Sequence, residues 1–315
     1  MKNSCKYLII LFLSFLITLP LHARVKVFCP TIDILNNNNV FSEVLDTLPT
    51  AKKRLKGEAK PKKRKKDKNK KVTFQTFDYN YERALNFYEN GQYLSAARLF
   101  EELYPLAIGT NRADTILFFF ANCYYQNRDF EMAAFHFKDY VRRYPRSERT
   151  ELAHLMAVKA IYNLSPYYAL DQMETNYAIE ELNLFISLYP QSKYMDECNG
   201  MLDDLRNKLA KKDFEIIKLY FNTEHYQATQ IAITNFLKLY SYSPYAAEAA
   251  FILVKNNYQF AKKSVEKKKV ERYRDCVEAY QSFLINYPES TWLKEAKKYA
   301  DDAQKQIDRK TEKKA

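Results

Sequence analysis

Glycine is scarce in this chain: only four glycines occur in 315 residues, at positions 57, 91, 109 and 200. Phosphate-binding loops need closely spaced glycines, and the nucleophile elbow of serine hydrolases needs a glycine two residues to either side of the serine. Neither arrangement occurs. Aromatic residues are by contrast abundant, with 26 tyrosines and 21 phenylalanines. This balance favours an all-helical protein that packs through large aromatic side chains.

Cysteine and histidine are also few, and their spacing does not suit a metal site. The five cysteines and four histidines form no Cys-x-x-Cys pair and no His-Glu-x-x-His motif. Cys123 and Cys276 fall within amphipathic segments, where a free cysteine behaves as a small hydrophobic residue. Adjacent acids such as Glu101 and Glu102 point about 100° apart on a helix and do not converge on a substrate. We expect no metal, no cofactor, no catalytic residue and no enzymatic activity.

The positive charge of the chain is concentrated in one short segment. The formal net charge is +12, but residues 52–71 alone contain 13 lysines and arginines against two acids, which leaves residues 72–315 neutral overall. Such a segment has little apolar surface to bury. The sequence therefore predicts a disordered arm over residues 24–71, with a Lys-rich run at 52–71. An anionic membrane surface is the partner considered for this run. Nucleic acid is not expected, because the folded part has no basic excess.

The first residues have the outline of an export signal. Lys2 and Lys6 precede an uncharged segment from Tyr7 to Leu19, and Leu21-His22-Ala23 resembles a signal-peptidase site. We therefore expect a signal peptide over residues 1–23 rather than a membrane anchor, since the apolar segment is shorter than the ~20 residues that span a bilayer. Lipidation at Cys29 is not favoured, because Lys26-Val27-Phe28 is a poor lipobox.

A repeated spacing of residues dominates the rest of the chain. A small residue is followed by bulky residues at +4 and +7 and by proline at +12, as in Ala133, Phe137, Tyr140 and Pro145. Offsets of 4 and 7 place side chains on one helical face, and the proline is expected to end the helix. Two further complete copies are Ala178, Leu182, Phe185, Pro190 and Cys276, Tyr280, Phe283, Pro288. Degenerate copies contain Ala96, Phe100, Leu103 and Thr229, Ile233, Phe236.

The five copies predict an all-α, tetratricopeptide-like superhelix of about five helix pairs over residues 72–310. Successive small residues are 37, 45, 51 and 47 positions apart, more than the ~34 residues of the tetratricopeptide consensus. We therefore expect longer loops and extra helical turns, at 165–175, 193–210 and 262–269. A C-terminal capping helix is expected at 292–307, and a short tail at 311–315.

The segment from Ser165 to Ser192, SPYYALDQMETNYAIEELNLFISLYPQS, resembles the central part of the BamD family in its Bacteroidetes form. Members of this family are the tetratricopeptide subunits of the outer-membrane β-barrel assembly machinery. Tyr81-Glu-Arg-Ala, Gly91-Gln-Tyr and Tyr144-Pro-Arg-Ser support the resemblance, which covers about residues 75–308. Leu170-Asp171-Gln172 is its most specific element.

The resemblance implies a non-enzymatic scaffold, periplasmic and associated with the inner face of the outer membrane. Its partners would be the periplasmic domains of a BamA-like barrel insertase and the C-terminal segments of unfolded outer-membrane proteins. Two other interpretations stay open at this stage. One is a periplasmic tetratricopeptide adaptor for envelope or cell-division enzymes, and the other is a cytoplasmic repeat protein with a nucleic-acid tether.

A peptide-binding face is expected on the first helices of the first two pairs, which line the concave side of such repeats. If Ala84 and Ala121 pack inward, neighbouring side chains at offsets of 3 and 4 share an adjacent face. We also expect at least one ring of Phe118-Phe119-Phe120 to be exposed, since consecutive residues differ by about 100°. The candidate client-binding residues are Tyr81, Leu85, Tyr88, Phe118, Asn122 and Tyr125, together with Tyr104, which the family resemblance suggests.

Overall fold

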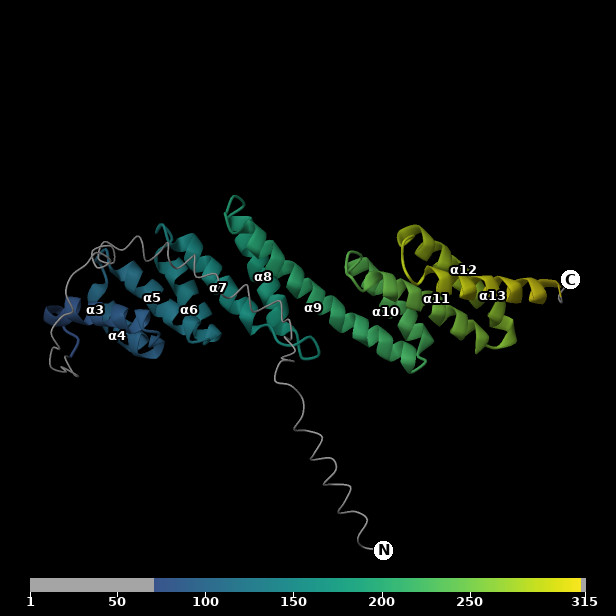
Figure 1. Ribbon diagram of the computed structural model, residues 1–315, viewed down its shortest axis with the longest axis horizontal. Coiled ribbons are helices and arrows are strands. Elements are labelled where there is room, and N and C mark those ends of the chain that lie inside the picture. The colour runs from purple at the N-terminus through teal and green to yellow at the C-terminus, as the bar shows by residue number, and fades with distance from the viewer. Residues whose placement is uncertain (1–70, 313–315) are drawn as a thin grey trace, which may run out of the picture. The chain divides into compact units, whose positions relative to one another are not determined.

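The computed structural model describes residues 71–312, and all regular structure in this range is helical (Figure 1). The expected signal peptide, the expected arm up to residue 70 and Cys29 lie outside the described residues. A short 3-10 turn, η2 (Phe74–Thr76), precedes eleven α-helices. They are α3 (Phe77–Glu89), α4 (Tyr93–Ala107), α5 (Ala113–Gln126), α6 (Phe130–Arg143), α7 (Thr150–Leu164), α8 (Met173–Leu188), α9 (Met195–Asn222), α10 (Tyr226–Leu239), α11 (Ala246–Lys262), α12 (Glu266–Asn286) and α13 (Leu293–Glu312).

Each helix packs against the next one along the chain. The pairs are α3–α4, α5–α6, α7–α8, α9–α10 and α11–α12, and α13 packs on both helices of the last pair. The predicted fold class, a tetratricopeptide-like stack of five helix pairs with a C-terminal capping helix, is therefore confirmed. The capping helix is longer than expected. It continues to Glu312 and takes in the first two residues of the expected tail.

The repeated spacing marks the core of every pair. Ala133, Phe137 and Tyr140 of α6 are fully buried, because offsets of 4 and 7 turn all three toward the neighbouring helices. Tyr280 is the exception among the bulky positions, since its side chain is only partly buried. The equivalent residues of the other second helices are buried as well: Ala96, Phe100, Leu103, Ala178, Leu182, Phe185, Thr229, Ile233, Phe236, Cys276 and Phe283.

Proline follows the end of the second helix by two residues in three pairs, at α6, α8 and α12, but not in the first and fourth pairs. Helix α6 ends at Arg143, two residues before Pro145, as expected. Helix α4 instead passes through Pro105 and ends at Ala107. A proline in the last turn removes only one backbone hydrogen bond, so the helix tolerates it there. The chain then turns at Gly109, whose φ of 85° is readily adopted by glycine alone.

The additional length of the repeats is divided between helices and one loop. Helix α9 has 28 residues and α12 has 21, as the expected extra turns at 193–210 and 262–269 require. The loop before α8 is held together by Gln172, whose side-chain amide donates to the carbonyl oxygens of Tyr167 (2.9 Å) and Leu170 (3.0 Å). Gln172 of the Leu-Asp-Gln sequence thus has a structural role in this loop.

Candidate functional site

The expected client-binding residues differ widely in exposure. Phe118 and Asn122 of α5 have no accessible surface, and Tyr81 and Tyr88 of α3 are 9% and 8% exposed. These four side chains are core residues, which corrects the expectation that they lie open on a concave face. Leu85, Tyr104 and Tyr125 are partly exposed. Of the seven candidates, these three offer the most surface to a ligand.

Tyr88 is buried because it joins the first two helix pairs. Its hydroxyl accepts a hydrogen bond from the side-chain amide of Asn122, and its ring packs edge-on against Phe119 (5.1 Å between centroids) and Tyr93 (5.5 Å). Burial raises the pKa of Tyr88 far above its usual value, so the phenol stays protonated. The hydroxyl is thus committed to a contact between repeats.

The three consecutive phenylalanines of α5 are all buried, so the expectation that one of them is exposed was wrong. Phe118 packs edge-on against Phe137 of α6. Phe119 stacks on Phe100 of α4 at 6.0 Å between centroids. Phe120 is 7% exposed and contacts His136 of α6. Helix α5 has neighbours in several directions, so side chains 100° apart all find a partner.

Tyr125 lies where three first helices come close together. Its ring packs edge-on against Phe130, with centroids 5.5 Å apart. Burial raises the pKa of Tyr125 to about 12, the charge of Glu197 on α9 raises it too, and a hydrogen bond with Asn163 on α7 opposes the shift. Nearby, the Lys159 ammonium lies 2.7 Å from Glu197. Polar side chains of α7 and α9 thus lie near the ring of Tyr125 on α5.

Tyr104 lies at the end of α4 and contacts the end of α6. Its hydroxyl is 3.2 Å from the hydroxyl of Tyr144, and the guanidinium of Arg143 lies 5.9 Å from the centre of its ring. Arg143 also binds the carboxylate of Asp139 at 2.6 Å. The phenol pair and the arginine give this corner hydrogen-bond donors and a positive charge.

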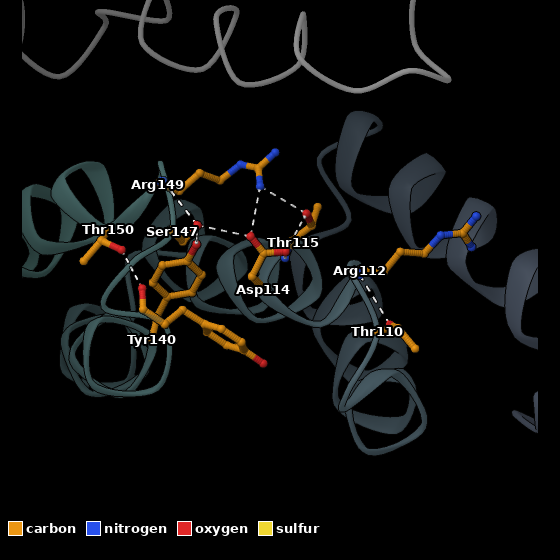
Figure 2. Close-up of polar contacts among 9 residues, drawn as sticks. Thr110, Arg112, Asp114, Thr115, Tyr140, Ser147, Arg149 and Thr150 are labelled. Atoms are coloured by element: carbon orange, nitrogen blue, oxygen red, sulfur yellow. Dashed lines mark hydrogen bonds and ion pairs between the residues drawn. The ribbon is translucent and has the colours of Figure 1, made fainter.

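A polar network at Ser147 holds the turn that follows α6 (Figure 2). The Ser147 Oγ lies 2.9 Å from the hydroxyl of Tyr140 and donates to the carboxylate of Asp114 on α5 (3.2 Å). The guanidinium of Arg149 donates to the same carboxylate (3.3 Å) and to the Thr115 hydroxyl (3.2 Å). The Tyr-Pro-x-Ser ending of this pair is thus a structural turn that ties α6 back to α5, the first helix of its own pair.

The same turn follows other pairs. Ser192 donates to Glu151 on α7 at 2.6 Å, and its Oγ accepts the backbone N–H of Tyr194 at 3.1 Å. In the first pair Thr110 makes the same backbone contact, since its Oγ1 accepts the N–H of Arg112 at 3.3 Å (Figure 2). Thr110 was not identified from the sequence. Its position, two residues before Arg112 at the start of α5, was a usable signal, because serine and threonine hydroxyls often accept a nearby backbone N–H.

Helix α8 presents an apolar stripe that sequence reasoning also missed. Met173, Tyr177, Leu184 and Leu188 are 72%, 44%, 47% and 55% exposed. Their spacings of 4, 7 and 4 place them on one helical face, distinct from the face that buries Ala178, Leu182 and Phe185. Groups of exposed apolar side chains are typical of surfaces that contact other proteins.

Two buried cysteines of the described residues are held in the neutral form. Burial raises the pKa of Cys198 to about 11 and that of Cys276 to about 12, so both thiols stay protonated. Within residues 71–312 no three histidine, cysteine or acidic side chains come together as a metal site would need. In the same range no helix combines the length and the apolar character needed to cross a membrane.

Comparison with solved structures returns other proteins built from tetratricopeptide (TPR) repeats. The TPR2AB domain of yeast Sti1, solved in complex with pHSP90, is 14% identical, with 73% of this chain and 99% of that chain covered and a TM-score of 0.38. The TPR domain of P58(IPK) is 12% identical, with 74% and 66% covered and a TM-score of 0.36.

Comparison of sequences identifies the family. Residues 75–229 and 215–312 match the profile of the YfiO family, described as outer membrane lipoproteins. A curated relative, the outer membrane protein assembly factor BamD of Buchnera aphidicola subsp. Acyrthosiphon pisum, is 24% identical over 147 residues, or 43% of this chain and 59% of that protein. The match thus spans about three fifths of the relative's length. Because the family profile covers well over half of the chain, this protein belongs to the YfiO family of outer membrane lipoproteins, and the resemblance to BamD is confirmed.

Proposed function

We propose that this protein is a non-enzymatic scaffold of the outer-membrane β-barrel assembly machinery, located in the periplasm at the inner face of the outer membrane. The observation that carries the proposal is the match of residues 75–312 to the YfiO family, together with the likeness to a protein named as an outer membrane assembly factor. Stacked helix pairs present extended surfaces that suit such a role. The partners proposed are the periplasmic domains of a BamA-like insertase and the C-terminal segments of unfolded outer-membrane proteins.

Two surfaces support a role in protein binding. The apolar stripe of α8, formed by Met173, Tyr177, Leu184 and Leu188, offers four exposed apolar side chains that a folded partner would cover. The partly exposed Leu85, Tyr104 and Tyr125 remain the candidates for contact with an extended client. Tyrosine supplies both an apolar ring and a hydrogen-bonding hydroxyl, which suits the aromatic-ended C-terminus of a barrel protein.

Co-purification tests the scaffold role and the α8 surface together. The tagged full chain, extracted from envelopes in mild detergent, should retain a barrel protein with polypeptide-transport domains. Leu184→Asp should release a partner bound at the apolar stripe, whereas Asn183→Asp, at the exposed neighbouring position, should not. Recovery of cell-division or peptidoglycan enzymes without the barrel protein would favour the alternative, a periplasmic adaptor for those enzymes.

Peptide binding tests the client surface. A fluorescent peptide with the sequence of a barrel protein's C-terminal strand should bind the wild-type chain and should bind Tyr104→Ala about thirtyfold more weakly, since an aromatic anchor contributes about 2 kcal/mol. Tyr242→Ala is the control, because Tyr242 is fully exposed in the turn after α10. Equal weakening by both variants would show that the loss is not specific to the client surface.

A further inference from the structure

The turn between α11 and α12 concentrates positive charge. Residues 262–269 comprise five lysines and one acid, Glu266, in a folded part of the chain whose overall charge is balanced. The turn joins the end of α11 at Lys262 to the start of α12 at Glu266. We refer to Lys262, Val265, Lys267 and Lys268 as the basic tip.

The acids near the basic tip are already neutralised by other lysines. The Lys263 ammonium lies 2.5 Å from the carboxylate of Glu224. Glu266 binds Lys269 at 2.6 Å and also binds Lys310 of α13, and these two hydrogen bonds lower the pKa of Glu266 to about 2. Lys262, Lys267 and Lys268 are exposed, and no described residue forms an ion pair with them. Their charge is therefore available to an outside partner.

The turn that carries these lysines is firmly braced. The backbone N–H of Ser264 donates to the carbonyl oxygen of Ala261 at 3.1 Å. Arg272 of α12 donates to the Ser264 hydroxyl, and its guanidinium lies 3.6 Å from the centre of the Phe260 ring. The side chain of Val265 nevertheless remains 68% exposed at the tip. A small apolar group is thus held outward between lysines.

Helix stability does not account for this arrangement. Lys267 and Lys268 lie in the first turn of α12, where the positive end of the helix dipole disfavours cations by about 0.3–1 kcal/mol each. Glu266 is the only acid in that turn. When residues are unfavourable for their own helix and no contact inside the fold compensates, a functional role is the common explanation.

We propose that the basic tip docks on an anionic lipid surface. Lysines that surround an exposed apolar side chain match the chemistry of a membrane interface, where the ammonium groups meet lipid phosphates and the apolar group enters the headgroup region. Membership of a family of outer membrane lipoproteins makes such a surface the natural partner. The surface is separate from the client-binding residues of α3–α5 and from the apolar stripe of α8.

A tryptophan placed at the tip provides a local measurement in the full chain. Val265→Trp is combined with Trp292→Phe, since Trp292 is the only native tryptophan and its stacking on Phe251 is preserved by phenylalanine. Vesicles of phosphatidylcholine with 30% phosphatidylglycerol should shift the emission to the blue, and brominated lipid should quench it. Pure phosphatidylcholine should do neither. At saturating lipid, the size of the emission shift depends on whether the tryptophan at the tip enters the membrane. It does so even if another segment of the chain also binds the vesicle.

Charge variants decide whether the lysines cause the docking. Lys262, Lys267 and Lys268 changed together to glutamine should raise the lipid concentration for half-maximal shift at least about tenfold or abolish the shift, because each lysine near an anionic membrane contributes about fivefold. The control changes Lys238, Lys294 and Lys297 to glutamine. These exposed lysines lie at the end of α10 and the start of α13, and they give the same change in net charge.

Three outcomes would overturn the proposal: no blue shift with anionic vesicles, an unchanged shift in the tip variant, or equal loss in tip and control variants. If the tip variant instead loses binding only to polyglutamate or to single-stranded DNA, the basic tip serves an acidic macromolecule and not a membrane.

Discussion

The side-chain amide of Asn122 donates a hydrogen bond to the hydroxyl of Tyr88, and this contact ties α5 to α3 across the first two helix pairs. Both side chains are buried. Tyr88→Phe should therefore lower the free energy of unfolding by about 1–2 kcal/mol, because the buried amide of Asn122 loses its partner. Tyr88→Ala should lower it by about 3–5 kcal/mol. Urea unfolding followed by circular dichroism measures both. If Tyr88→Ala unfolds at the same urea concentration as the wild type, Tyr88 is not a core residue and is again a candidate for ligand contact.

Two phenylalanines of α6 offer a matched comparison. Phe137 is fully buried, whereas Phe135, two residues earlier on the same helix, is 62% exposed. Phe137→Ala should destabilise the fold by about 3–5 kcal/mol, and Phe135→Ala by less than about 1 kcal/mol. Thermal unfolding of the two variants checks this difference. Similar melting temperatures for the two variants would contradict the assignment of Phe137, four residues after Ala133, to the core.

The spacing of small and bulky residues was a sufficient guide to this core. Ala133 and Phe137 could be assigned from sequence because a helical period fixes which side chains share a face. The burial of Phe118, Phe119 and Phe120 could not, because it depends on how many helices surround α5. A periodic pattern shows on which face of its helix a side chain lies, but it does not show which other helices cover that face.

The turn at Ser147 should contribute measurably to stability. Ser147→Ala removes the contacts of its Oγ with Tyr140 and Asp114 and should lower the free energy of unfolding by about 1–2 kcal/mol. Ser241→Ala, at an exposed position in the turn after α10, should change it by less than about 0.5 kcal/mol. Denaturant titration distinguishes the two. Equal effects would mean that the network in Figure 2 adds nothing beyond loop rigidity.

The role of this turn illustrates what a motif leaves undetermined. The Tyr-Pro-x-Ser endings indicated repeat boundaries, but their serine acts through Asp114 and Glu151, which lie more than thirty residues earlier in the chain. Only the folded arrangement brings these residues together. The same limit applies to Tyr104 and Tyr144, whose hydroxyls come from successive repeats.

Stability should fall under mildly acidic conditions because of His154. The ring is 6% exposed between Phe185 and Tyr189, and its Nδ1 has no hydrogen-bond partner. Burial lowers the pKa of His154; Glu181 raises it and Lys138 lowers it further. The unfolded chain therefore binds a proton more readily than the folded chain below about pH 6.5. The free energy of unfolding is therefore undiminished above that pH, and it decreases as the pH falls toward the pKa of His154 in the folded chain.

The measurement is the free energy of unfolding between pH 7.5 and 5. The wild type should lose up to about 1.4 kcal/mol per pH unit from this group, and His154→Gln should lose correspondingly less. His225→Gln is the control, since His225 is exposed in the turn before α10. If the free energy of unfolding depends on pH equally in the wild type and in His154→Gln, His154 is not the cause of the acid sensitivity.

Depletion of the protein in its own cells tests the assembly role most directly. After depletion, folded β-barrel proteins in the outer membrane are quantified by their heat-modifiable migration and by mass spectrometry, with lipoproteins as the internal reference. If the protein serves barrel assembly, several unrelated barrel proteins should decrease together and their unfolded forms should accumulate. Unchanged barrel proteins after complete depletion would contradict the proposed function.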